Sequence, residues 1–299
     1  LPTFVVLPDP RGLPNGGTSN WSQGFLPAQH QGTAFATDGK REPIANLKTP
    51  TTVSRSGRRA SLEFLSQFNR SFAAANPGND ELEARVRSYE LAARMQTSIP
   101  DAVNFRDETQ ATQRSYGLDD KSLAPSASNY LLARRLIERG VRFVQVYNGG
   151  ALGSPRINWD AHEDLVRNHG NQARHLDQPA AALLKDLKQR GLLDDTLVVW
   201  SSEFGRTPFT QGDAGKGRDH HPLVFSGWMA GAGLKAGFHH GISDEVGYRP
   251  AEDPVTVYDF HATLLHLMGI DHTRLTFYHN GLARRLTDVH GHVVHDVLA

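Results

Sequence analysis

Residues 196–222 constrain this chain more than any other stretch. The stretch begins with residues 196–200, an uncharged run of β-branched and aromatic side chains typical of a strand buried on both faces of a parallel sheet. A carboxylate, a glycine and a guanidinium follow directly, in Glu203, Gly205 and Arg206. Ligands of open α/β sheets bind beyond the carboxyl ends of the strands. The pattern therefore predicts a central strand with a functional loop at its end.

The preceding elements predict that this strand belongs to a parallel sheet. Residues 1–7 have the composition of a strand, and residues 127–140 form an amphipathic helix stopped by glycine and followed by a strand over 141–147. A long helix is expected over residues 178–190, leading into the strand at 196–200. Because crossovers between parallel strands are right-handed, the loops after both strands are expected at one edge of the sheet.

Other segments are predicted with less bearing on function. Residues 8–58 are rich in Pro, Gly, Ser, Thr and Asn, which interrupt regular elements, so an irregular segment is predicted there. A helical insert or cap is expected over 59–125, including a helix that opens at Asp80. Residues 256–268 predict an amphipathic helix, and residues 286–298 a terminal hairpin.

The composition excludes several classes of site and partner. The 299 residues can form one large domain or two smaller ones, and we expect one α/β domain over residues 1–299. Lys+Arg and Asp+Glu each number 32, so no global charge indicates a nucleic-acid partner. The chain has no cysteine, which excludes disulfides, thiolate metal sites and cysteine nucleophiles. No apolar run approaches the length of a membrane span.

Histidines are concentrated in the second half of the chain. Of the 15 histidines, every one except His30 lies at or after His162. This distribution indicates metal or proton chemistry there. For several of them, such as His239 and His292, the alternative of a solvated surface residue is favoured.

Four residues together have the side chains that a divalent cation requires. Asp160, His162, Glu203 and His220 offer nitrogen and oxygen ligands for a zinc, manganese, calcium or magnesium ion without any thiolate. The sequence leaves the metal open. It also leaves open whether His169 replaces His162 as a ligand, and whether His221 replaces His220.

Arg206 and Arg218 are the candidate catalytic residues beside these ligands. Guanidinium groups neutralise the non-bridging oxygens of an anionic ester as charge develops during its cleavage. The alternative is structural: each arginine forms an ion pair with Glu203 or Asp219 and makes its loop rigid. The sequence does not separate these two roles.

Several motifs carry a resemblance to a known family. They are TLVVWSSEFGRTP, GRDHHP, NWDAHEDLVRNH, DFHATLLHLMGI, WSQGFLPAQHQGT and LLARRLIERGVRFVQVY. In these motifs the chain resembles the bacterial sulfatase-like family of unknown function 1501, which is assigned to the alkaline phosphatase superfamily. The resemblance implies an alkaline phosphatase-like α/β fold, with a mostly parallel central sheet flanked by helices. It also implies a metal-dependent hydrolase of sulfate or phosphate esters.

The resemblance assigns roles to individual residues. Glu203 stands where the superfamily has a metal-binding aspartate, and His220 stands for its late histidine ligand. Asp160 and His162 stand near its aspartate and histidine pair. Phe204 departs from the usual histidine or asparagine, so the resemblance does not extend to a second metal site of the usual type.

The resemblance also bears on the substrate and the cellular location. The superfamily takes its nucleophile and its first metal aspartate from a region before the start of this chain, so an N-terminally truncated and inactive fragment is expected. The parent protein is expected to be exported or periplasmic, with its signal lost. The implied partner is an anionic ester, with a sulfated or phosphorylated saccharide as one candidate; the oligomeric state stays open. A non-catalytic exported binding protein and a phosphomutase-like transferase are the alternatives.

Overall fold

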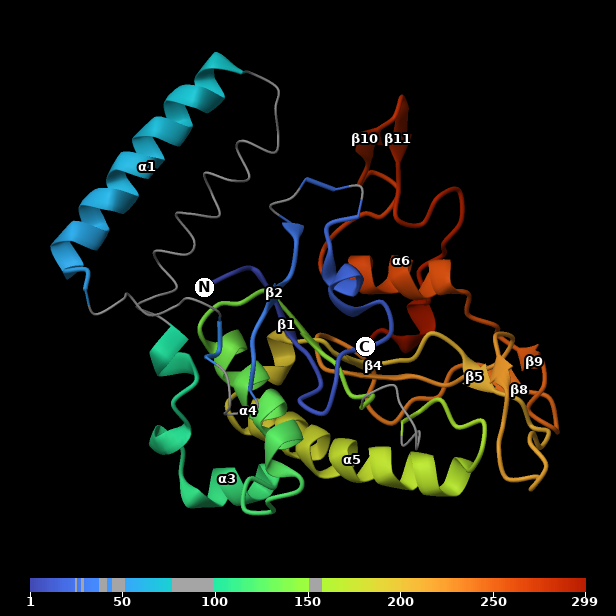
Figure 1. Ribbon diagram of the computed structural model, residues 1–299. Helices are drawn as coiled ribbons and strands as arrows, with labels where there is room; N and C mark the ends of the chain where they lie inside the picture. The colour runs from blue at the N-terminus through green and yellow to red at the C-terminus, as the bar shows by residue number, and fades with distance from the viewer. Residues whose placement is uncertain (25, 28–29, 38–41, 45–51, 77–98, 151–157) are drawn as a thin grey trace. The chain divides into compact units, whose positions relative to one another are not determined.

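A computed structural model shows a mixed α/β structure (Figure 1). It describes residues 1–24, 26–27, 30–37, 42–44, 52–76, 99–150 and 158–299. The chain divides into two compact units, of which the first comprises Leu1–Trp159 and Gly170–Leu183 and the second Asp160–His169 and Leu184–Ala299. Helix α5 (Leu165–Gln189) contributes residues to both units.

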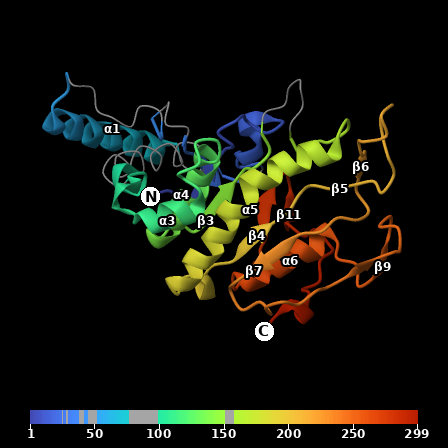
Figure 2. The same ribbon diagram turned by 90° about the horizontal axis from the view of Figure 1, so that it is seen from below.

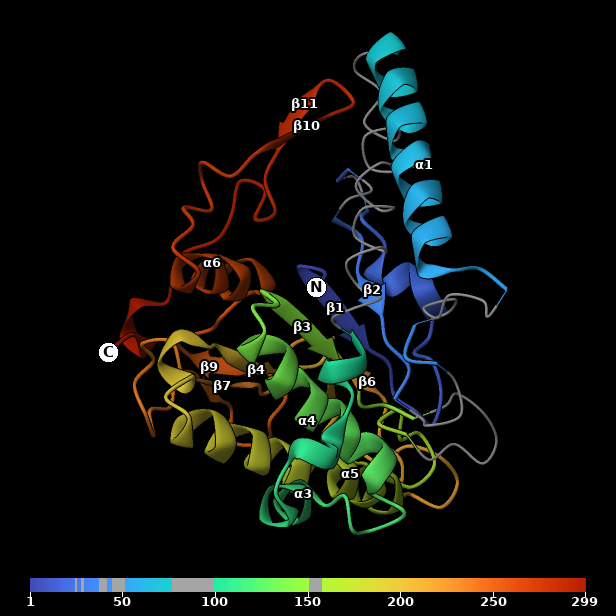
Figure 3. The ribbon, with the colours of Figure 1, turned by 90° about the vertical axis from the view of Figure 1, so that its left-hand side faces the viewer.

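The first unit is built on a parallel sheet of three strands in the order β2-β1-β3. Its elements, besides its part of α5, are β1 (Phe4–Leu7), η1 (Gly17–Trp21), β2 (Thr33–Ala34), α1 (Arg55–Ala75), η3 (Phe105–Asp107), α3 (Gln110–Tyr116), α4 (Ala124–Glu138) and β3 (Phe143–Val146). Strands β1 and β3 run side by side in Figure 3, with Phe4 opposite Phe143 and Leu7 opposite Val146. The predicted strand–helix–glycine–strand order of this unit is therefore confirmed.

Helix α4 and strand β1 supply much of the core of the first unit. The helix has a proline in its first turn and is followed by Gly140, whose φ of 82° is a left-handed conformation that suits glycine at a helix end. Val5 and Leu7 from β1 and Leu132 and Leu136 from α4 belong to one buried cluster. Burying such aliphatic side chains is worth about 1.5–3 kcal/mol each, which fixes the helix against the sheet.

Asp9 joins the loops that leave β1 and β3. Its carboxylate accepts hydrogen bonds from the Arg11 side chain at 2.9 and 2.7 Å. It also accepts from the backbone N–H groups of Gly149 and Gly150, both at 2.9 Å. Burial raises the pKa of Asp9, but the hydrogen bonds and the positive charge of Arg11 lower it by a larger amount. The pKa of Asp9 therefore lies below its usual value. The carboxyl ends of these two strands are thus held together through one ionised side chain.

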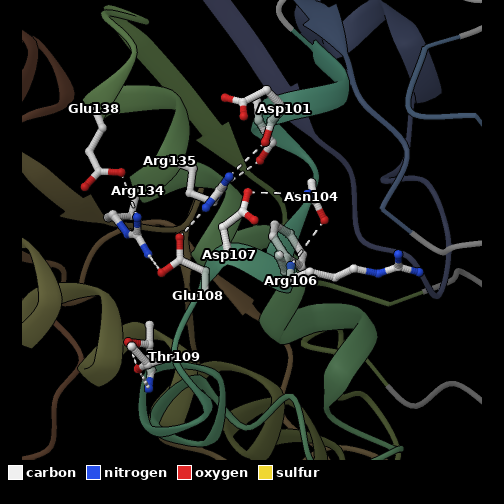
Figure 4. Close-up of polar contacts among 12 residues, drawn as sticks. Asp101, Asn104, Arg106, Asp107, Glu108, Thr109, Arg134, Arg135 and Glu138 are labelled. Carbon is white, nitrogen blue, oxygen red and sulfur yellow. Dashed lines mark hydrogen bonds and ion pairs between the residues drawn. The ribbon is translucent and has the colours of Figure 1, made fainter.

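A buried ion-pair cluster attaches α4 to the segment that precedes α3. Glu108 contacts both Arg134, at 2.6 Å, and Arg135, and the Arg134 guanidinium also contacts Glu138 at 2.7 Å (Figure 4). The side chains of Arg134, Arg135 and Glu108 are 1, 5 and 7 % exposed. Because removal of one partner leaves buried charge without its counter-ion, this cluster is sensitive to single substitutions.

We predict that Glu108→Ala lowers the free energy of unfolding by about 3 kcal/mol, because it takes the shared carboxylate away from two buried guanidinium groups. Equilibrium urea unfolding measures this loss. The matched control is Glu63→Ala, which breaks the exposed pair between Glu63 and Arg59 and should change stability by less than about 0.5 kcal/mol. Equal effects of the two substitutions would contradict the prediction.

The second unit contains short antiparallel pairs of strands within the described residues. Its elements, besides its parts of α5, are η4 (Leu193–Asp195), β4 (Val198–Trp200), β5 (Gly205–Arg206), β6 (His220–His221), β7 (Trp228–Ala230), β8 (Ile242–Ser243), β9 (Pro250–Glu252), α6 (Val257–Leu267), β10 (Phe277–His279), β11 (Leu282–Arg284) and η5 (His295–Val297). The pairs are β4-β7, β5-β6, β8-β9 and β10-β11.

Strand β4 differs from its prediction. The strand forms where expected, but it pairs antiparallel with β7, and Val199 is 37 % exposed. A mostly parallel central sheet is therefore not shown among the described residues, where the parallel sheet is β2-β1-β3. The β-branched run determines that a strand forms, whereas the direction of its partner depends on the later chain, which here returns at Trp228.

Two further boundaries are corrected. Helix α5 begins at Leu165 instead of residue 178, because Asp164 caps it by accepting from the Arg167 backbone N–H at 3.0 Å. The hairpin predicted over residues 286–298 is wrong, because that segment holds turns and η5 and no strand pair. A hairpin forms before it, at β10-β11, where Asn280 and Gly281 both have positive φ, as a tight two-residue turn requires. Helix α6 confirms the predicted amphipathic helix.

The expected insert over residues 59–125 stays a prediction. Most of helix α1 falls within it, but the helix expected to open at Asp80 lies outside the described residues.

Candidate metal centre

Three predicted ligands come together in the second unit. Asp160 Oδ1 lies 2.8 Å from His162 Nε2 and 2.9 Å from His220 Nε2, and the two nitrogens are 3.1 Å apart. Among the described residues these side chains form a group whose ligand atoms all lie within 4.8 Å of one another, as a metal ion requires. The group joins the loop before α5 to strand β6.

A long β-hairpin, residues 205–221, supplies one side of this centre. Its base is the pair of strands β5 and β6, labelled in Figure 2. In this pair Arg206 lies opposite His220. Further along, Gln211 and Gly217 exchange two backbone hydrogen bonds of 2.8 and 3.0 Å. These two pairings, at the base and near the tip, fix how the two arms of the hairpin align.

The loop over residues 160–165 is bound to this hairpin through its backbone. The Arg218 N–H donates to the Ala161 carbonyl at 3.0 Å, and the Leu165 N–H donates to the Lys216 carbonyl at 3.0 Å. Within the loop, the His162 N–H donates to the Asp160 carbonyl at 3.1 Å, which makes a tight turn. Ala161 at the centre of this turn is fully buried, so the polar residues on either side are carried by a fixed backbone.

Gly217 allows the close approach of the loop and the hairpin. A Cβ atom at this position would lie 1.7 Å from the His162 carbonyl oxygen and 3.0 Å from that of Gln211. The Gln211 carbonyl accepts the Gly217 N–H, and His162 directly follows Ala161, whose carbonyl accepts the Arg218 N–H, so a shift of either oxygen would disturb the backbone pairing of loop and hairpin. Glycine is required here by space, because its φ is not in the left-handed region.

The electrostatics of the centre keep Asp160 ionised. Burial raises the pKa of Asp160, but the hydrogen bonds from His220 and Arg206 and the charges of His162 and Arg206 lower it more, to about 2. Arg206 Nη2 donates to the same oxygen, Oδ1, at 2.9 Å. Asp160 is therefore a carboxylate at neutral pH, which is the form that ligates metals.

The chemistry and the spacing of the three atoms fit a divalent ion. Ligand atoms on one tetrahedral zinc ion, with bonds of about 2.0–2.2 Å, stand about 3.3 Å apart. The separations of 2.8, 2.9 and 3.1 Å are a few tenths shorter. Small movements of the side chains would thus bring all three atoms to coordination distance. Two imidazoles and a carboxylate are a frequent protein ligand set for zinc, with one position left for water or substrate.

The remaining predicted residues lie as follows. The carboxylate of Glu203 is exposed, accepts a hydrogen bond from Ser202 at 3.1 Å and is not part of the three-residue group. Arg206 donates to Asp160 and to the Arg218 carbonyl, and Arg218 donates to the Gly217 carbonyl at 2.8 Å. The structure thus places both arginines on the hairpin and uses Arg206 to hold a ligand.

The two alternative histidines lie elsewhere. His221 is buried, and its Nε2 lies 2.7 Å from the carbonyl oxygen of Tyr248. The His221 ring also stacks on the Tyr248 ring. His169 lies within α5. The three-residue group contains His162 and His220 instead.

Sequence reasoning missed Gln211, whose Oε1 lies 2.8 Å from His162 Nδ1. No motif marks this glutamine, which is separated from His162 by 49 positions. Phe204, in contrast, stood out in the sequence. Its ring lies 4.2 Å from that of His220, so it packs against a candidate ligand.

The fold and this centre define a mixed α/β protein with a candidate divalent-metal site. The chain belongs to the family described as "Protein of unknown function (DUF1501)", whose family model matches residues 1–298. Neither the curated proteins nor the solved structures give a match to this chain. Among the helices in the described part of the chain, none has the length and hydropathy needed to cross a membrane.

We predict that Gly217→Ala separates the loop from the hairpin, because its Cβ would overlap the His162 carbonyl. A loss of stability of about 2 kcal/mol or more is expected, as for other overpacked sites. The control is Gly170→Ala in α5, where an added Cβ meets no atom within 4 Å and a helical alanine is favoured. Thermal unfolding compares the two variants, and an unchanged midpoint in Gly217→Ala would contradict the assigned role.

Proposed function

We propose that the second unit carries the metal site of a hydrolase acting on phosphate or sulfate esters. The observation that supports this most directly is the group of Asp160, His162 and His220, with ligand atoms 2.8 to 3.1 Å apart. Such a donor set suits zinc better than manganese, calcium or magnesium, because imidazole nitrogen prefers zinc and the other three prefer oxygen ligands. The resemblance to sulfatase-like proteins suggests the class of ester.

Each residue of the site has a distinct part in this proposal. Asp160 supplies negative charge and an oxygen ligand, and His162 and His220 supply neutral nitrogen ligands. Glu203 is the proposed fourth ligand, since it precedes Phe204, whose ring contacts the His220 ring. It would have to leave its hydrogen bond with Ser202 to reach the ion.

A divalent ion bound here would supply a Lewis acid for the ester oxygen and would lower the pKa of a bound water. The chain's own contribution is positive charge beside that position. Arg206 is half-buried and fixed by Asp160, so its guanidinium is oriented before substrate arrives. Arg206 and Arg218 together would neutralise the non-bridging oxygens of a phosphate or sulfate group.

A non-catalytic binding protein is the second candidate. The contact of Phe204 with His220 favours it, because an aromatic ring takes up space directly beside a ligand. An exported protein that retains this fold would then bind an anionic polymer or ester without cleaving it. The two candidates share the metal site and differ in turnover.

We predict that this chain binds one zinc ion with the three-residue group. Calorimetric titration should give one site per chain in the wild type. Asp160→Asn and His220→Ala should each weaken binding by about 100-fold or more, because each removes one of three ligands. Glu203→Gln should weaken it by a smaller factor if Glu203 is the fourth ligand, and leave it unchanged if water takes that position.

His239→Ala is the control, because His239 is an exposed histidine outside the group. Equal zinc binding by all of these proteins would overturn the proposed site. Where zinc binds as expected, assays with 4-nitrophenyl phosphate and 4-nitrophenyl sulfate separate the two candidates. Turnover that is lost in Asp160→Asn supports the hydrolase, and binding without turnover supports the binding protein only when the parent protein also lacks turnover.

A further inference from the structure

Gln211 stands behind one of the candidate ligands. Its side-chain oxygen Oε1 lies 2.8 Å from Nδ1 of His162, on the side of the ring opposite to Nε2, which faces Asp160 and His220. Both residues belong to the second unit. The contact therefore lies within one compact part of the chain.

The contact favours a proton on Nδ1 of His162 when an ion is bound at Nε2. An amide oxygen can only accept a hydrogen bond, so Nδ1 must be the donor. When the neutral imidazole has its single proton on Nδ1, the lone pair is on Nε2. That lone pair then points at the position where the ligand atoms of Asp160 and His220 converge.

The backbone of Gln211 is fixed independently of its side chain. Its N–H donates to the Gly217 carbonyl at 2.8 Å, and its carbonyl accepts from the Gly217 N–H at 3.0 Å. The neighbouring backbone of Arg218 binds the Ala161 carbonyl at 3.0 Å. Gln211 thus reaches His162 from the same hairpin that binds the loop of His162.

The surroundings of Nδ1 favour the same proton position. Asp219 Oδ1 lies 3.7 Å from His162 Nδ1 and accepts the backbone N–H of His220 at 2.8 Å. A carboxylate at this distance stabilises a hydrogen on Nδ1. Two acceptors, one amide and one carboxylate, therefore lie on the side of the ring that faces away from the metal position. Without an ion, Asp160 Oδ1, 2.8 Å from Nε2, also stabilises a hydrogen on Nε2, so the preference for the Nδ1–H form belongs to the state in which a bound ion neutralises Asp160.

Metal-bound histidines in proteins usually donate their other N–H to a carboxylate, a carbonyl or a water, and loss of that partner costs about 10- to 100-fold in metal affinity. We infer that Gln211 is a positioning residue of the metal centre, which holds His162 in the Nδ1–H tautomer so that Nε2 can bind the ion. The inference rests on the proposed metal site. It adds to that site a residue that makes no contact with the ion.

Two variants test the inference by zinc affinity, measured by calorimetric titration. Gln211→Ala should bind zinc about 10- to 100-fold more weakly than the wild type, because the Nδ1–H group of metal-bound His162 loses its acceptor. Gln211→Glu should restore the affinity, because a carboxylate also accepts from Nδ1.

The control is Gln189→Ala, since Gln189 is an exposed glutamine near the end of α5. It should match the wild type in zinc affinity, and the thermal unfolding midpoints of all variants should match that of the wild type. Zinc binding by the wild type with unchanged affinity in Gln211→Ala overturns the role of Gln211 alone. No zinc binding by the wild type overturns the proposed site and this role together.

Discussion

The candidate centre depends on backbone hydrogen bonds between one loop and one hairpin. Two of them, from Arg218 to Ala161 and from Leu165 to Lys216, bring the loop over residues 160–165 against the 205–221 hairpin at 3.0 Å each. Side chains alone would not suffice, since holding three polar groups within about 3 Å costs conformational entropy and desolvation. Because the backbone hydrogen bonds already hold the loop and the hairpin together, the side chains of Asp160 and His220 need only adopt the right rotamers to meet.

The local pattern of the sequence predicted elements better than partners. Amphipathic spacing and Gly140 determine α4 and the start of β3, and their packing follows from apolar side chains next to each other along the chain. The partner of β4 depends on where the chain returns some thirty residues later, which no local pattern encodes. The start of α5 was missed because its cap, Asp164, stands before a polar stretch in which the apolar period is weak.

Three of the four predicted ligands come together, but not in the way that the sequence predicted. Asp160, His162 and His220 were expected to meet at the common edge of a parallel sheet, whereas a tight turn and a hairpin bring them together. Residue type identified them, because imidazole and carboxylate side chains in loops are the metal ligands available in a chain without cysteine. Gln211 and Gly217 could not be found in this way. Their importance arises from contacts across the chain, one with an imidazole nitrogen and one with a carbonyl oxygen.

In Arg206 the observed contact with a candidate ligand is compatible with the proposed role toward an anion. Its guanidinium has five N–H groups in a fixed plane, and its Nη2 and Nη1 atoms donate to Asp160 and to the Arg218 carbonyl at 2.9 and 3.2 Å. These bonds orient the ligand carboxylate, and they place a half-buried positive charge beside the ion position. An anionic ester that reaches the ion would meet this charge without any rearrangement. Substitution of Arg206 would therefore change ligand orientation and anion affinity at once, and only the comparison of zinc binding with anion binding separates the two effects.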